Sequence, residues 1–281
     1  MFSHKHIQIL HEFFAGIEGV LPLEPVRKVH DLTGIPMRDI HIYALQNGLI
    51  PARYERNIGT VGVAGQIKLL QSCALIIGLG GLGGNVIEQL ARIGVGKIIA
   101  TDFDEFDESN LNRQILSSHQ ALGKSKSKTA QQRVELINSD VTYIGYEKKL
   151  DELDDGVFGE CDVVFDCLDN VPDRLVLGDR CKRANVTLIH AAIAAWYAQV
   201  AIVGPGSGKM KKIYKDQCPT EKHQSPIEKK LGCPVFTAAV AASLMTSQGV
   251  KVLIGETIDD EDAIVTVDLL SNEVIKVNSF K

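Results

Sequence analysis

The sequence has little of what would cross-link a protein covalently or anchor it in a membrane. It contains six cysteines in 281 residues, and no two of them have the C-x-x-C spacing of a zinc ribbon or a redox dithiol. No apolar run approaches the roughly 20 residues that a membrane helix needs, and the first residues lack the apolar core of a signal peptide. We therefore expect a cytoplasmic protein whose cysteines mostly pack as small apolar side chains.

A large excess of one charge is also missing. There are 30 Lys and Arg residues against 35 Asp and Glu residues, which gives a net charge of −5. This excludes a general electrostatic attraction to nucleic acids or to anionic membranes. Hydrophobic residues make up 45% of the chain and charged residues 23%, values that also exclude a disordered, collagen-like or coiled-coil chain.

In residues 1–50 the sequence pattern predicts helices and no strands. Apolar residues recur at helical spacing over 7–14, and short helices are expected over Val26–Leu32 and Met37–Asn47. This helix–turn–helix outline allows a DNA-binding interpretation. The last helix offers few basic side chains for that role, so we favour a helical N-terminal extension that packs on the main domain or on a second subunit.

From residue 72 onward, apolar strands alternate with amphipathic helices. This alternation predicts an α/β fold with a Rossmann-like, doubly wound, mainly parallel sheet, followed by a C-terminal antiparallel hairpin over Ile264–Val277. The predicted strands are Cys73–Ile77, Lys97–Thr101, Val141–Tyr146, Asp162–Asp166, Thr187–Ile189 and Gln199–Val203, and the predicted helices are Leu82–Ile93, Ser125–Asn138, one opened by Pro172, and Ala238–Leu253.

A glycine-rich loop lies between the first of these strands and its helix. Gly78, Gly80 and Gly83 fit the pattern G-x-G-x-x-G, in the strand–loop–helix context that makes the pattern credible. Small glycines let a phosphate approach the backbone, and the helix N-terminus supplies amide donors. Asp102 follows the next strand, where a carboxylate can accept hydrogen bonds from ribose hydroxyls. The pattern predicts a nucleotide site, for which NAD is the most common ligand.

The residues after Asp102 favour a nucleoside triphosphate instead. Asp104 adds a second acid beside the ribose position, and Asn110 and Arg113 can bind phosphate oxygens. Lys126 starts a helix, where a cation opposes the helix dipole unless an anion lies nearby. A dehydrogenase has no need for this set.

A further acid, Asp169, follows the fourth predicted strand. Parallel strands present their carboxyl ends to one crevice, so Asp169 should lie on the side of the glycine loop and Asp102. A carboxylate there can hold Mg²⁺, which takes one or two carboxylates plus phosphate oxygens. The alternative is that Asp169 caps the helix opened by Pro172; Asp166 is interpreted as structural.

These motifs resemble those of the ThiF/MoeB/HesA family, the bacterial relatives of ubiquitin-activating enzymes. The resemblance covers roughly residues 53–255. It rests on Arg53–Asn57, the Gly78–Gly84 loop, Asp102–Asp104, Ser109–Gln114, Gly123-x-x-Lys126 and Asp166–Asn170.

The resemblance implies an ATP-binding adenylation domain over residues 51–281. It implies ATP-dependent adenylation of the C-terminal glycine of a ubiquitin-like sulfur-carrier protein of the ThiS or MoaD type, which ends in Gly-Gly, with release of pyrophosphate. Arg56 would enter the site of a neighbouring subunit, which implies a homodimer. The nucleotide would be held by Gly78, Gly80, Gly81, Gly83, Asp102, Asp104, Asn110, Arg113 and Lys126, with Asp169 organising Mg²⁺.

The sequence departs from the family in its cysteines. Family members often carry two C-x-x-C pairs that bind zinc, and this chain has neither, so we expect no zinc. Many members carry a thiol on a flexible crossover loop; here that loop corresponds to the lysine-rich residues 204–232, interpreted as either a solvated loop or a flap over a site. Cys218 and Cys233 are both candidates for the thiol nucleophile, although neither spacing fits closely.

Three other functions stay open. A tRNA threonylcarbamoyladenosine dehydratase shares the same ATP site, but the acidic chain makes a nucleic acid an unfavourable partner. An NAD-linked redox enzyme and a non-catalytic nucleotide-binding scaffold are the remaining alternatives. The sequence does not select the carrier or the pathway.

Overall fold

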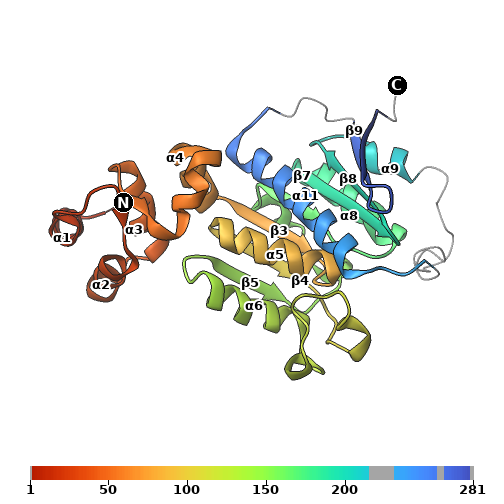
Figure 1. Cartoon of the computed structure of the whole chain (residues 1–281), viewed down its shortest axis with the longest axis horizontal. Coiled ribbons are helices and arrows are strands. Elements are labelled where there is room, and N and C mark those ends of the chain that lie inside the picture. Colours follow the sequence, from red (N-terminus) through yellow and green to blue (C-terminus); the bar gives the residue numbers. More distant parts are fainter. Residues whose placement is uncertain (1, 215–230, 258–262, 279–281) are drawn as a thin grey trace.

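The computed structural model describes residues 2–214, 231–257 and 263–278. A small helical unit lies at one end of a larger α/β domain (Figure 1). The described chain forms an eight-stranded sheet in the order β10-β9-β8-β7-β6-β3-β4-β5. Its strands are β3 (Cys73–Ile77), β4 (Lys97–Thr101), β5 (Thr142–Tyr146), β6 (Val163–Asp166), β7 (Thr187–Ala194), β8 (Tyr197–Val203), β9 (Ala263–Asp268) and β10 (Glu273–Asn278).

The sheet is parallel from β7 through β6, β3 and β4 to β5, and β8, β9 and β10 add antiparallel strands at one edge. This confirms the predicted mainly parallel, doubly wound sheet with its C-terminal hairpin. β7 is longer than predicted, because its second half continues beyond the parallel strands and pairs only with β8.

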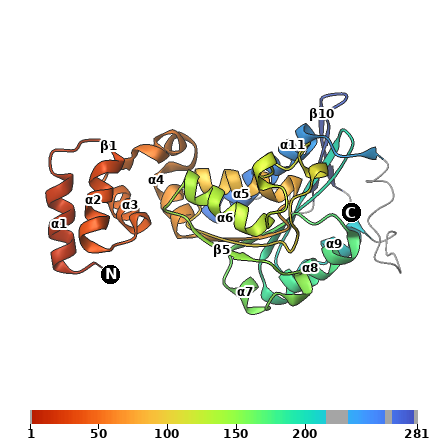
Figure 2. The same ribbon diagram turned by 90° about the horizontal axis from the view of Figure 1, so that it is seen from below.

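Helices cover both faces of the sheet (Figure 2). Alternate residues of each strand point to opposite faces: Ala74 and Ile76 pack into one core, and Leu75 and Ile77 into the other. The first core lies under α5 (Gly81–Ile93), α6 (Lys126–Ile137) and α11 (Val235–Ile254), and the second under α7 (Gly156–Gly159), α8 (Val171–Ala184) and α9 (Lys209–Ile213).

The last helix, α11, is long and apolar enough to cross a membrane by length and composition, and half of that stretch is buried. It packs on β7, β8 and α5. Its place in the first core accounts for its apolar composition.

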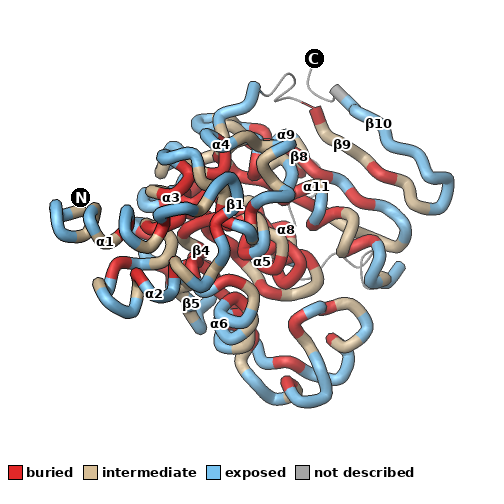
Figure 3. The backbone as a smooth tube through the Cα atoms, turned by 60° about the vertical axis from the view of Figure 1, so that its left-hand side comes forward, coloured by how far each residue is buried: buried red, intermediate tan, exposed pale blue. Residues whose placement is uncertain are grey.

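The N-terminal unit has a core of its own. The helices α1 (His4–Phe14), α2 (Leu23–Thr33) and α3 (Met37–Gln46) surround Leu10, Val26, Val29 and Ile40, all of which are fully buried. The short strands β1 (Val20–Leu21) and β2 (Ile50–Pro51) pair in parallel, and η1 (Ala52–Tyr54) leads into α4 (Glu55–Gln71), which ends just before β3. In Figure 3, buried residues lie both in this unit and in the central sheet.

Part of the lysine-rich segment is ordered, unlike the irregular loop that the sequence predicts. Lys209 is buried and its ammonium group donates to the carbonyls of Ile202 (2.9 Å) and Ala263 (3.0 Å). Met210 packs on Gly178 of α8. These contacts fix α9 to the domain, and positions 215–230 lie outside the described residues.

Candidate nucleotide-binding site

The turns after β3, β4 and β6 meet at the carboxyl edge of the sheet. Gly78 has φ +93° and donates its N–H to the carbonyl of Thr101, which ends β4 (2.9 Å). A Cβ on Gly78 would lie 2.7 Å from the carbonyl oxygen of Cys167, in the turn after β6, and a Cβ on Gly83 would overlap the carbonyl oxygen of Gly78. The loop is therefore packed so closely that only glycine fits at these two positions.

Asp102 is bound to the glycine loop by its carboxylate. One oxygen accepts the N–H of Leu79 (2.6 Å) and the other accepts the N–H of Asp104 (2.8 Å). Burial raises the pKa of Asp102 above its usual range, against the opposing charge of Lys126. Each carboxylate oxygen has a second lone pair, so Asp102 can bind the loop and a ribose hydroxyl together.

Lys126 lies in the same cluster. Its ammonium group is 3.0 Å from the carboxylate of Asp104, and only 8% of its side chain is exposed. Ser125 caps α6 through the N–H of Lys128. Asp104 is therefore the anion that balances a lysine at a helix N-terminus. The pair belongs to the Asp102 turn, since Asp104 also donates its N–H to Asp102.

The segment around η2 (Glu108–Asn110) packs along the glycine loop. Arg113 donates to the carbonyl of Ser109 (2.9 Å) and to the side chain of Asn112 (2.8 Å), and its Cγ lies 3.6 Å from the place of a Cβ on Gly81. Asn110 is buried, and its amide oxygen accepts the N–H of Asp107 (3.2 Å). Asn110 thus shapes the segment, and Arg113 lies beside the loop.

Gln114 has a place in this site that the sequence reasoning missed. It is 6% exposed, and its amide nitrogen lies 3.7 Å from the place of a Cβ on Gly80. Its amide oxygen has no hydrogen-bond partner in the part of the chain that the structure describes. A buried acceptor without a partner is costly, so this atom suits a ligand donor. The sequence signal for Gln114 is its position next to Arg113 in the segment Ser109–Gln114.

Asp169 is exposed in the turn that follows β6. Within residues 2–214, 231–257 and 263–278, no three His, Cys, Asp or Glu side chains form a group that could hold a metal ion. A single carboxylate beside a phosphate site suits Mg²⁺, which keeps water and takes phosphate oxygens as its other ligands. The donor set of this edge therefore fits Mg²⁺ only together with a nucleotide.

Arg56 does not lie at this edge in its own protomer. It is exposed near the start of α4, where its neighbour Asn57 donates to the carbonyl of Ile93, at the end of α5 (3.3 Å). That end of the sheet is separated from Gly78 by the length of β3, about 17 Å at the usual strand rise. A role for Arg56 at the carboxyl edge requires a second protomer.

The two candidate thiols are Cys218 and Cys233. Cys218 lies outside the described residues, and Cys233 is half-buried. Cys233 lines an open hollow of about 420 Å³ with Asn112, Trp196 and Phe236. Since Asn112 precedes Arg113, this hollow adjoins the segment that packs along the glycine loop. The other described cysteines, Cys73, Cys161, Cys167 and Cys181, are buried.

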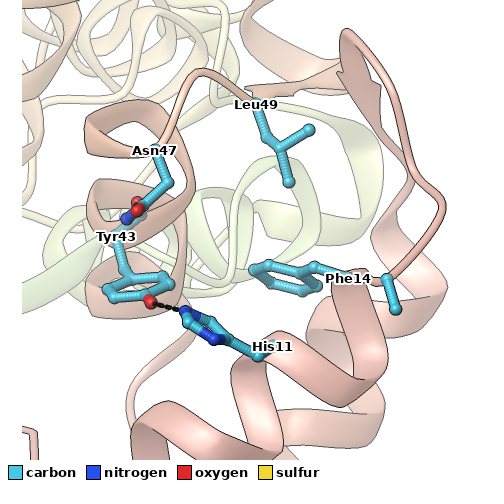
Figure 4. Close-up of a pocket in the computed structure, with 6 residues that line it drawn as sticks. His11, Phe14, Tyr43, Asn47 and Leu49 are labelled. Carbon is cyan, nitrogen blue, oxygen red and sulfur yellow. Dashed lines mark hydrogen bonds between the residues drawn. The ribbon is translucent and has the colours of Figure 1, made fainter.

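A second hollow, of about 320 Å³, lies in the N-terminal unit (Figure 4). It is lined by His11 and Phe14 of α1, Tyr43 of α3, and Leu49. His11 Nε2 and the hydroxyl of Tyr43 are 2.9 Å apart. This hollow shares no residue with the crevice at the carboxyl edge.

Curated relatives match a little over half of the chain. The ThiS adenylyltransferase of Escherichia coli is 38% identical over 157 residues, which cover 54% of this chain and 62% of that protein. The SAMP-activating enzyme E1 of Haloferax volcanii is 36% identical over 54% of this chain and 58% of its own. MOCS3 of Xenopus laevis, an adenylyltransferase and sulfurtransferase, is 37% identical over 53% and 34%. The chain thus spans a third to three fifths of these relatives' lengths.

Solved structures share the fold over nearly the whole chain. MccB in complex with N-formylated MccA superposes with a TM-score of 0.67 at 22% identity, over 98% of this chain and 87% of that one. PaaA superposes with a TM-score of 0.64 at 20% identity, over 82% and 73%. Because the superposition on MccB covers 98% of this chain, the shared fold includes the N-terminal unit. The ThiF family profile matches residues 54–281, and the chain belongs to the ThiF family.

Proposed function

We propose that this protein is an ATP-dependent adenylyltransferase that activates the C-terminal glycine of a small ubiquitin-like sulfur carrier of the ThiS or MoaD type. Residues 51–281 form the adenylation domain, and residues 1–50 are a helical extension. Relatives named for ThiS adenylation and SAMP activation support this assignment. We propose a cytoplasmic enzyme, with α11 as a helix of the protein core.

The observation that carries the proposal is the packing of Arg113 and Gln114 against the glycine loop, beside the Asp102–Leu79 bond. A cation, a buried acceptor and a ribose-binding acid then converge on one backbone cradle. Gly78, Gly80, Gly81 and Gly83 admit the phosphates, and Asp104 and Asn110 shape the walls. A dinucleotide site would need the glycine loop and the acid but not this cation.

In the proposed reaction the carrier's terminal carboxylate attacks the α-phosphorus of ATP, and pyrophosphate leaves from the opposite side. The product is an acyl-adenylate. The nucleophile is already an anion near pH 7, so no side chain has to remove a proton. Catalysis then consists of positioning and of balancing charge on the phosphate oxygens, which falls to Arg113 and Lys126. When ATP binds, the ammonium group of Lys126 would either exchange its ion pair with Asp104 for one with a phosphate or contact both groups.

Asp169 would hold Mg²⁺, which neutralises phosphate charge when it is bound. Arg56 would complete the site from the other protomer of a homodimer. Cys233 shares its hollow with Asn112, the neighbour of Arg113, and its thiol could receive the activated carboxyl group as a thioester while AMP leaves. Cys218 remains the other candidate for that step.

Carrier-dependent exchange of labelled pyrophosphate into ATP tests the proposed function. Purified carriers of the ThiS and MoaD types that end in Gly-Gly would be supplied with ATP and Mg²⁺. We expect exchange that requires the terminal glycine and disappears when that residue is deleted. Absence of exchange with every carrier, in a preparation that binds ATP, would remove the proposed function.

A further inference from the structure

Four buried polar side chains meet beneath the turn that carries Asp169. Asp166 ends β6, His190 lies beside it on β7, Arg174 belongs to α8, and Tyr214 follows α9. All four are at least nine-tenths buried. Neither the sequence motifs nor the proposed reaction uses His190 or Tyr214. A polar cluster of this kind is costly to bury unless each member is bonded.

The printed hydrogen bonds of the cluster agree with one order of donors and acceptors, with His190 in the tautomer that carries its hydrogen on Nδ1. Arg174 donates from Nη1 to the hydroxyl oxygen of Tyr214 (2.9 Å). That hydroxyl has one hydrogen, and His190 Nε2 lies 3.1 Å away to receive it. His190 then carries its own hydrogen on Nδ1 and donates it to Asp166 Oδ2 (2.6 Å). Burial lowers the pKa of His190, against the effect of Asp166, which agrees with this neutral ring.

The first and last members of this hydrogen-bond series, Asp166 and Arg174, both bind the backbone of Leu168 in the turn. The second oxygen of Asp166 accepts the N–H of Leu168 (3.1 Å). Arg174 donates from Nη2 (2.7 Å) and Nε (3.2 Å) to the carbonyl of Leu168. The two peptide units that flank Leu168 are therefore held on both sides, and the second of them leads directly into Asp169.

The turn also touches the glycine loop. The carbonyl oxygen of Cys167 lies where a side chain on Gly78 would be. The backbone that directs Asp169 and the backbone that forms the phosphate cradle are thus packed together, and the buried cluster supports both from below.

We propose that His190 and Tyr214 are positioning residues that hold the Leu168–Asp169 peptide, and so direct the Asp169 carboxylate toward the metal–nucleotide complex. The inference rests on the proposed function in one respect, since it takes Asp169 as the carboxylate that meets Mg²⁺. Loss of the Tyr214 hydroxyl removes one hydrogen bond of Arg174 and one of His190, so the two residues that hold Leu168 from either side are fixed less firmly.

The test compares Tyr214→Phe with Tyr43→Phe in the full-length protein. Both changes remove one tyrosine hydroxyl from a histidine, at 3.1 Å in the cluster and at 2.9 Å in the N-terminal unit. ATP binding is measured by calorimetry with Mg²⁺ and with EDTA, and melting temperature is recorded for each variant. We expect Tyr214→Phe to reduce the factor by which Mg²⁺ tightens ATP binding by about three- to tenfold, the size of one lost hydrogen bond. Binding in EDTA, and both values in Tyr43→Phe, should stay within about twofold of the wild type.

A merely structural role would lower the melting temperature of Tyr214→Phe while leaving the Mg²⁺ factor at its wild-type value, and that result would overturn the inference. In the exchange assay, kcat should fall by the same three- to tenfold while KM for the carrier holds. If wild-type protein shows the Mg²⁺ effect on ATP binding but no exchange, the proposed function fails, and a reduced Mg²⁺ factor in Tyr214→Phe still supports the inference. If Mg²⁺ does not tighten ATP binding to the wild type, the inference fails.

A second pair of variants keeps the test decisive if Tyr214→Phe does not fold. His190→Asn retains a donor near the position of Nδ1 for Asp166 and loses the acceptor for Tyr214, whereas His190→Leu loses both. We expect the Mg²⁺ factor to fall further in His190→Leu than in His190→Asn. Equal, wild-type factors in both variants would contradict a positioning role.

Discussion

The two edges of the sheet each bury a histidine–aspartate pair of the same geometry. At the carboxyl edge, His190 Nδ1 is 2.6 Å from Asp166, and at the amino edge, His41 Nδ1 is 2.6 Å from Asp140. The first pair lies under the candidate nucleotide site. The second joins α3 of the N-terminal unit to the loop before β5, and so lies between two parts of the fold.

The surroundings of the two pairs differ. Asp140 also lies 3.0 Å from Arg53 and accepts the hydroxyl of Tyr54 (3.3 Å). Burial alone would raise the pKa of Asp140, but the bond to His41 and the charges of His41 and Arg53 outweigh it and hold that pKa below its usual range. At the carboxyl edge, burial instead prevails and lowers the pKa of His190. A histidine–aspartate pair thus accompanies a carboxyl group with a lowered pKa, Asp140, at the junction and an imidazole with a lowered pKa, His190, under the candidate site.

The largest effect that separates the two edges is expected from the cations of the crevice. Arg113→Ala or Lys126→Ala should lower the rate of pyrophosphate exchange by about 10²–10³, the usual loss when one charge-stabilising group is removed. Lys128→Ala is the control, because Lys128 is two residues from Lys126 and pairs with Glu147 on the surface. Near-normal exchange in Arg113→Ala and Lys126→Ala would remove the phosphate role.

At the amino edge, the expected effect is on stability. Asp140→Asn should lower the free energy of unfolding by about 2–3 kcal/mol, because it weakens charge-assisted bonds to His41 and Arg53. The folded pKa of Asp140 is depressed, so its stabilisation is present above about pH 4 and is lost as the pH falls through the folded value. Urea unfolding from pH 3 to 7 should therefore show a flatter acid limb in the variant. An unchanged acid limb would contradict the account of the junction.

A smaller effect is expected from the pH response of His190. Because its folded pKa is depressed, its contribution to stability is complete above about pH 6.5 and is lost as the pH falls toward the folded value. The slope from one such group reaches at most about 1.4 kcal/mol per pH unit. Urea midpoints between about pH 5 and 7 should depend less on pH in His190→Asn than in wild type. His11→Asn serves as the exposed control, and equal slopes in His190→Asn and wild type would contradict a lowered pKa of His190 in the folded protein.

The comparison also shows what the sequence could predict. The sheet and its glycine loop were predictable, because strand–helix alternation and G-x-G-x-x-G are local patterns. The order of strands brought Asp102 and the Asp169 turn to the same edge by a general rule of parallel sheets. The family resemblance then supplied the roles of Arg113 and Lys126, which remain predictions.

Long-range partners were not predictable. Asp104 as the partner of Lys126 depends on how the η2 segment folds back. No periodic signal links His41 and Asp140, which are 99 positions apart in the sequence. Tyr214 reaches His190 from a segment whose lysine-rich composition indicated an irregular loop. These pairings depend on which side chains tertiary packing buries together, and a local pattern does not encode that.

The most direct test of the central claim is the mass of the carrier after reaction. A Gly-Gly carrier would be incubated with the protein, ATP and Mg²⁺, and the intact carrier weighed by mass spectrometry. The account predicts a carrier that has gained one adenylate with the wild type and with Asp140→Asn, but not with Arg113→Ala. An adenylated carrier formed equally by Arg113→Ala would contradict the assignment of the carboxyl-edge crevice as the site of the reaction.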